Sequence, residues 1–226
     1  MKKFPWLLLF IVVLAIEIAA VIINNQFLQF VFKPLLMPML AGYLLSELKS
    51  ENSGLKKWIL AAIFFSWVGD ILLMLVDKDP EFFLAGLISF LVAHIFYVLT
   101  FFQVLRNEKG KIRVWILIVV AVSYLLLMIW LSPYLGEMKW PVRIYGFVIC
   151  TMLFLAMHLS YIKFKSAGIL VMYGALLFVI SDFLIATNKF YGSLGIIGFL
   201  IILTYGLAQL LIVVGTSYYL RTVKST

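Results

Sequence analysis

The sequence is poor in charged residues, which make up only 12% of its 226 positions, whereas 65% are hydrophobic. Soluble domains carry about 25% charged residues, so this chain cannot cover itself with a polar surface. Its apolar residues form runs of about 20 positions, the length that crosses the hydrocarbon layer as a helix. The runs lack the period-two alternation of membrane β-barrel strands. We therefore expect an all-helical transmembrane bundle, because each span must satisfy its own backbone hydrogen bonds.

Residues and motifs typical of metal and nucleophile sites are also scarce. The one cysteine, Cys150, cannot form an intrachain disulfide, and only two histidines are present. The sequence contains no HExxH, CxxC, glycine-rich phosphate loop or GxSxG pattern. Hydrolytic zinc sites need three close protein ligands, so we expect no metal site. The net charge of +8 does not indicate nucleic-acid binding, because the cations lie in short loops between the apolar runs.

Eight spans are predicted within a single transmembrane domain that covers residues 1–226. The connectors are short and polar and leave no room for a soluble domain. The N-terminal MKK followed by an apolar run resembles a signal peptide, but Glu17 interrupts that run, and we expect a first span there. The predicted spans are 4–23, 28–47, 58–76, 82–104, 114–131, 141–161, 168–186 and 194–216.

The distribution of basic residues predicts the orientation of the chain in the membrane. Thirteen of the 18 Lys and Arg residues fall on the side that holds both termini, and four fall on the other side. Because cytoplasmic loops are enriched in Lys and Arg, we expect both termini in the cytoplasm. We expect the protein in a bacterial inner membrane.

Two segments resemble each other and suggest an internal repeat of four plus four spans. FFSWVGDILLML in the third span and LLFVISDFLIAT in the seventh place an aspartate at the same position. Both spans run outward in the predicted topology, so the duplication would be parallel. Chance similarity between apolar segments remains the alternative.

The two aspartates of these segments, Asp70 and Asp182, are the first candidates for a functional site. An ionised side chain in the hydrocarbon layer costs about 2.5–3.5 kcal/mol on insertion scales. Each aspartate lies seven residues before a charged residue at the end of its span. At 1.5 Å per residue, this places both about 10 Å below the outer boundary. We expect the two carboxyls to meet in one cavity as a catalytic pair; the alternative is that each is a structural hydrogen-bonding group.

Lys33 is a candidate substrate-binding residue near the outer end of the second span. Pro34 and Pro38 weaken this helix and free carbonyl groups, which is tolerated where they line a cavity. Lys33 could neutralise Asp70 or hold a phosphate. It could also extend outward to the membrane surface without a role in the site.

Five further polar residues are candidates for supporting roles. His94 and Tyr97 share one face of the fourth span, and Tyr205 and Gln209 share one face of the eighth. Each pair could orient a carboxyl or a water molecule, or could instead link helices through polar contacts. Tyr145 lies near the outer end of the sixth span, where an interfacial aromatic belt is the simpler explanation.

Two polar residues are not assigned to the site. Glu17 stands alone on the first span. His158 lies near the inner end of the sixth span, away from both aspartates, where we expect it at the membrane interface.

Taken in order, five segments around these residues resemble the motifs of the lysoplasmalogenase (YhhN-like) membrane family. The resemblance covers nearly the whole chain, including its length and span count, except residues 106–140. The segments are FKPLLMPML, SWVGDILLML, FLAGLISFLVAHIFYV, YGALLFVISDFLIA and TYGLAQLLIVVG.

The resemblance implies a hydrolase that cleaves the vinyl ether bond of lysoplasmalogens to a fatty aldehyde and a glycerophospho-base. It implies that Asp70 and Asp182 carry the acid–base chemistry, with a membrane lysophospholipid as substrate. Two close carboxyls would titrate as a pair and supply one acid and one base, so the reaction needs no cofactor.

Two other functions are compatible with the sequence. A transporter also combines repeated halves, membrane aspartates and a proline-broken helix, and would move its substrate without chemical change. In a non-catalytic lipid-binding or regulatory protein, the aspartates would only hold helices together.

Overall fold

The chain folds into a bundle of helices. The computed structural model describes residues 5–49, 51–192 and 196–225, and these contain no strand. The longer helices are α1 (Trp6–Ile22), α2 (Gln26–Phe32), α3 (Leu36–Glu47), α4 (Gly54–Met74), α5 (Glu81–Asn107), α6 (Val114–Leu131), α7 (Lys139–Leu159), α8 (Lys165–Ala186) and α9 (Ile197–Ser225). The short ones are η1 (Lys33–Leu35), η2 (Ser132–Tyr134), η3 (Gly136–Met138) and the π-helical turn η4 (Thr187–Tyr191).

The helices have the length and composition of membrane spans, which confirms the predicted fold class. Seven segments within the described residues are long and apolar enough to cross a bilayer, with α2 and α3 forming one of them. The apolar α1 has 17 residues, at the lower limit for a span. The chain is therefore an integral membrane protein. The predicted starts of the first span at residue 4 and of the eighth at residue 194 lie outside the described residues.

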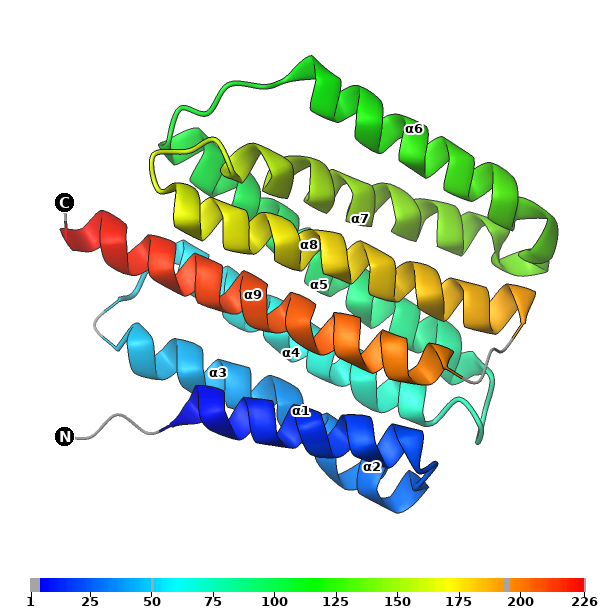
Figure 1. Cartoon of the computed structure of the whole chain (residues 1–226). Coiled ribbons are helices and arrows are strands. Elements are labelled where there is room, and N and C mark those ends of the chain that lie inside the picture. The colour runs from blue at the N-terminus through cyan, green and yellow to red at the C-terminus, as the bar shows by residue number, and fades with distance from the viewer. Residues whose placement is uncertain (1–4, 50, 193–195, 226) are drawn as a thin grey trace.

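Successive segments run in opposite directions, so the loops alternate between two ends of the bundle (Figure 1). The start of α1 and the end of α9 lie at the same end, which we call the inner end. The outer end holds the loops at residues 23–25, 75–80 and 132–138. That the inner end faces the cytoplasm rests on the Lys and Arg distribution and stays a prediction.

The second span is broken, as its two prolines predict. Helix α2 passes into a 3-10 turn at Lys33–Leu35, and α3 continues to the inner end. Pro38 has no N–H to bond the carbonyl of Pro34. The indole N–H of Trp67 on α4 donates to that carbonyl at 2.9 Å instead. The break is thus stabilised by a neighbouring helix.

The site is positioned by two closely packed helix pairs, α4 with α5 and α8 with α9. A Cβ on Gly69 would lie 2.6 Å from the ring of Phe90, and one on Gly174 would lie 2.9 Å from the carbonyl oxygen of Ala208. Only glycine allows the helices to approach so closely at these points. The two pairs occupy corresponding places in the predicted repeat, which itself stays a prediction.

Helix α6 lies at the edge of the bundle and packs mainly on α7 (Figure 1). Leu125 and Ile129 on its outer face are 56% and 71% exposed. Large aliphatic side chains exposed in this way face the lipid.

Candidate active site

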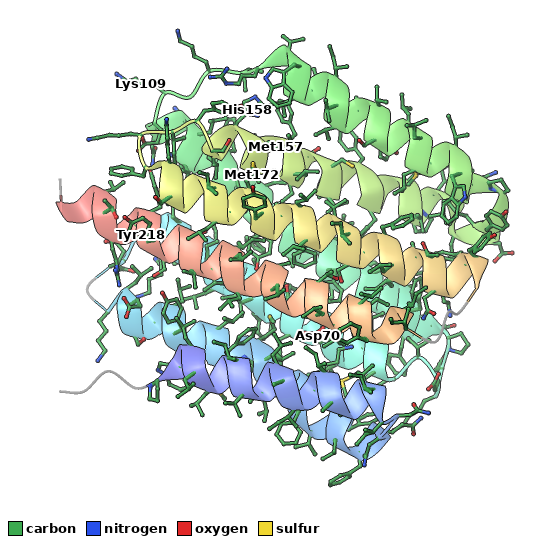
Figure 2. The ribbon with its side chains drawn as sticks, viewed as in Figure 1. Asp70, Lys109, Met157, His158, Met172 and Tyr218 are labelled. Atoms are coloured by element: carbon green, nitrogen blue, oxygen red, sulfur yellow. The ribbon has the colours of Figure 1, made fainter. Side chains whose placement is uncertain are left out.

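Asp70 on α4 is buried and bonded to a tyrosine of a distant helix. Its side chain is 2% exposed, and the hydroxyl of Tyr205 on α9 donates to its Oδ2 at 2.7 Å. Figure 2 shows Asp70 inside the bundle, farther from the inner end than His158. The structure therefore brings together two residues that the sequence predicted separately.

Asp182 on α8 has a different set of neighbours. The hydroxyl of Tyr145 on α7 donates to its Oδ2 at 2.5 Å, and Nε2 of His94 on α5 lies 3.7 Å from the same oxygen. Tyr145 is only 8% exposed, so it does not belong to an interfacial aromatic belt. Asp182 is 12% exposed. It is thus the more accessible of the two carboxyls.

The hydrogen bonds of His94 determine which ring nitrogen faces Asp182. Nδ1 lies 2.6 Å from the carbonyl oxygen of Phe90, which can only accept, so Nδ1 carries a hydrogen. In the neutral ring, Nε2 then holds a free lone pair. This nitrogen is buried and has no hydrogen-bond partner among the described residues. It is placed to accept a proton next to Asp182.

Tyr97 and Gln209 bond to each other and not to an aspartate. The hydroxyl of Tyr97 donates to Oε1 of Gln209 at 2.5 Å, and Nε2 of Gln209 donates to Oγ of Ser66 at 2.9 Å. Ser66 lies one turn before Asp70 on α4, and Gln209 lies one turn after Tyr205 on α9. This network therefore links α4, α5 and α9 close to the Asp70–Tyr205 pair. Ser66 was not expected, because an isolated serine in an apolar run carries no distinctive signal.

The two aspartates lie at matching levels of their helices but in separate surroundings. Each precedes the last residue of its helix by four positions. The rings of Phe90 and Phe178 pack between them: Phe178 contacts His94 at 4.6 Å and Tyr205 at 5.5 Å between ring centroids. Phe90 contacts Tyr205 at 5.9 Å. The matched depth agrees with the sequence, whereas an aromatic layer takes the place of the expected shared cavity.

Lys33 and Glu17 form the charged surroundings of Asp70. Asp70 interacts electrostatically with Lys33, and Glu17 interacts with both. Glu17 on α1 is 0% exposed, and its carboxyl lies near the backbone of Lys33. The structure thus places Glu17 beside the site, although it was not assigned there from sequence. The sequence feature that could have identified Glu17 is its ionisable side chain within a 17-residue apolar helix, where a charge is costly.

Two apolar cavities meet at Asp182. One of about 50 Å³ lies among α4, α5, α7 and α8, and one of about 100 Å³ lies among α6, α7 and α8. Both are lined by Asp182, Tyr145, Val142 and Ala186. The larger cavity follows α6 from Leu131 to Val120, a length of about 16 Å. An elongated apolar groove is therefore lined by the carboxyl of Asp182 and the phenol of Tyr145 in its outer half, and the imidazole of His94 lies 3.7 Å from that carboxyl.

His158 lies apart from this site, as expected. Its Nε2 accepts from the backbone N–H of Arg113 at 2.9 Å, and its Nδ1 donates to the carbonyl of Phe154 at 2.7 Å. It is 1% exposed and so is buried rather than interfacial. It fixes the start of α6 on α7. Among the described residues, no three His, Cys, Asp or Glu side chains converge as a metal site requires.

The sequence model of the YhhN family matches residues 28–216 of the chain. The lysoplasmalogenase TMEM86A of Homo sapiens is 32% identical over 158 residues, which are 68% of this chain and 62% of that protein. The lysoplasmalogenase TMEM86B of Rattus norvegicus is 32% identical over 156 residues, which are 69% of this chain and 60% of that protein. The matched part thus spans less than two thirds of either relative. No solved structure matches the chain.

Proposed function

The chain belongs to the YhhN family, and on that premise we propose that it is a hydrolase of lysoplasmalogens in a bacterial inner membrane. It cleaves the vinyl ether bond to release a fatty aldehyde and a glycerophospho-base. The names of the two relatives support the substrate class. The observation that carries the proposal is that Asp182 and its hydrogen-bond partner Tyr145 line an apolar groove, with Nε2 of His94 3.7 Å from the carboxyl.

The groove suits the hydrocarbon chain of a single-tailed lipid. Its apolar lining extends over about 16 Å, and it lies next to α6, which faces the lipid. A chain bound in the groove places its first carbons beside Asp182. The vinyl ether is located at these first carbons.

Asp182 acts as the acid in the first step. Its protonated carboxyl transfers a proton to the second carbon of the alkenyl chain, and the double-bond electrons form that C–H bond. The result is an oxocarbenium ion at the first carbon and its ether oxygen. The carboxylate left on Asp182 stabilises this cation. Tyr145 holds the carboxyl in place through its hydrogen bond.

Water completes the reaction. It adds to the first carbon while Nε2 of His94 accepts its proton, giving a hemiacetal. The hemiacetal hydroxyl returns a proton to Asp182, the imidazolium protonates the departing glycerol oxygen, and the C–O bond breaks. The products are the aldehyde and the alcohol, and both side chains regain their starting protonation. Asp70 lines neither apolar cavity and positions Tyr205 through their hydrogen bond.

The test is aldehyde release by detergent-purified protein from an alkenyl lysophospholipid. The matching saturated ether lipid is the blank, because protonation cannot convert it to an oxocarbenium ion. We expect aldehyde from the alkenyl lipid only. A folded protein that releases none would contradict the proposal.

A transporter is the second candidate, because the second span is broken at Lys33–Leu35 beside membrane carboxyls. It predicts that sealed vesicles containing the protein take up a lipid or solute without cleaving it. Uptake without aldehyde would favour this candidate.

A further inference from the structure

A third cavity opens at the outer end of the bundle and differs in character from the two apolar ones. Its volume is about 420 Å³. That volume lies within the range of small-molecule sites, and most of the residues around it are polar or charged. The lining residues are Gln26, Gln29, Phe30 and Lys33 from the second span, and Leu73, Met74, Asp77 and Lys78 from the end of α4 and the following turn.

Lys33 is the residue of this cavity that most clearly requires a partner. It is half-buried at the break of a membrane span. Glu17 and Asp70 interact with it electrostatically, but the ion pairs within 4.0 Å that the described residues form join His94 to Asp182 and Arg221 to Glu47, not Lys33 to a carboxylate. A cation held in a membrane segment without a contacting counter-ion is costly. Lys33 lines a cavity large enough to admit an anion from outside the protein.

The cavity is adjacent to the candidate active site. Leu73 and Asp77 lie three and seven residues after Asp70, which puts the cavity about 5–10 Å outward from that aspartate. Leu73 also lines the smaller apolar cavity that contains Asp182. The side chain of Leu73 therefore lies between the polar cavity and the cavity that contains Asp182.

We propose that the polar cavity binds the phosphodiester head group of the substrate lipid, with Lys33 as the phosphate ligand. The proposal rests on the proposed function, since it names the binding site of the same substrate. Lys78 adds a second positive charge at the mouth of the cavity, and the amides of Gln26 and Gln29 supply hydrogen-bond donors. Asp77 faces the same space and suits the ammonium group of a zwitterionic base. The lipid then lies with its head group at the outer end, its vinyl ether at Asp182 and its chain along α6.

A pair of substrates tests the role of Lys33. The first is an alkenyl glycerophosphocholine, and the second is the corresponding alkenylglycerol, which lacks phosphate. We expect Lys33→Met to raise KM for the first about tenfold or more, while kcat/KM for the second stays within about twofold of wild type. Lys33→Arg should restore most of the loss. Lys57→Met, which removes an exposed lysine at the inner end, is the matched control.

An equal loss on both substrates would overturn the proposal, because Lys33 would then act on Asp70 and not on phosphate. The phosphate-free substrate also controls for folding, since a misfolded variant loses activity on both. A melting temperature of the purified variants separates that case from a direct effect on Asp70.

A binding measurement separates this proposal from the hydrolase itself. The saturated ether lysophosphocholine, which is not cleaved, is titrated against purified wild type and Lys33→Met, with glycerophosphocholine and inorganic phosphate as competitors. We expect weaker lipid binding in the variant and competition by glycerophosphocholine. If Lys33→Met binds the lipid more weakly than the wild type, but the wild type releases no aldehyde, the head-group site is supported and the hydrolase is rejected. Equal binding by both proteins, or inorganic phosphate binding as tightly as the lipid, would reject the head-group site.

Discussion

The hydroxyl of Tyr145 donates a hydrogen bond of 2.5 Å to Oδ2 of Asp182. The bond joins α7 to α8 inside the membrane and leaves the carboxyl facing two apolar cavities. Nε2 of His94 is directed at the same oxygen from 3.7 Å, too far for a direct hydrogen bond. A carboxyl, a phenol and an imidazole therefore meet at one oxygen.

Removing the hydroxyl of Tyr145 should lower turnover while the protein stays folded. We expect Tyr145→Phe to reduce kcat for aldehyde release by about 10–100-fold, because Asp182 loses the group that orients it. Tyr173→Phe, on the exposed face of α8, should leave kcat unchanged. If Tyr145→Phe has the same kcat as the wild type, the hydroxyl of Tyr145 has no role in turnover.

Asp182→Asn should abolish most turnover, since the amide cannot supply the proton. We expect a loss of about 100-fold or more in kcat, with the melting temperature in detergent close to wild type. Because the amide still accepts from Tyr145, the helix contacts are retained. A large fall in melting temperature with normal turnover per folded molecule would assign Asp182 a structural role instead.

The chain-length preference should depend on the groove beside α6. Val179 lines the groove, whereas its neighbour Ile180 is 39% exposed to lipid. We expect Val179→Phe to lower kcat/KM for a 16-carbon alkenyl chain about tenfold relative to an eight-carbon chain, because the added ring shortens the groove. Ile180→Phe should leave that ratio unchanged. If both variants give the wild-type ratio, the chain binds elsewhere.

The break in the second span should depend on Trp67. Trp67→Phe leaves the carbonyl of Pro34 without its donor at 2.9 Å. We expect a loss of about 1–3 kcal/mol in the free energy of unfolding, measured by denaturation in mixed micelles. Trp115→Phe on the lipid-facing side of α6 is the control, because Trp115 is 48% exposed. Equal effects of the two substitutions would mean that the bond to Pro34 adds nothing.

The site was only partly predictable from sequence, and the reason differs between residues. Asp70 and Asp182 were identifiable because an ionisable side chain in an apolar run needs a physical explanation. A polar side chain in an apolar run also needs an explanation, although a less pressing one than a charge does. This identified His94, Tyr97, Tyr205 and Gln209. Glu17 carried this signal too, yet standing alone on its span it suggested no partner.

Other members of the site carry no such signal. Phe90 and Phe178 separate the surroundings of the two aspartates, but a phenylalanine in a membrane span is indistinguishable by type from one that faces lipid. Ser66 binds Gln209 from an otherwise apolar turn. Such residues are recognised only by what they contact.

The sequence by itself determined the class of fold and the matching positions of the two aspartates along their helices. The physical reason is that bilayer thickness sets the length of each apolar run, and helical rise converts position in a run into depth. Only the tertiary structure decided that Asp70 pairs with Tyr205 and Asp182 with Tyr145. These pairings depend on which helices are neighbours and how each is rotated about its axis, and apolar runs of similar composition carry little information about either.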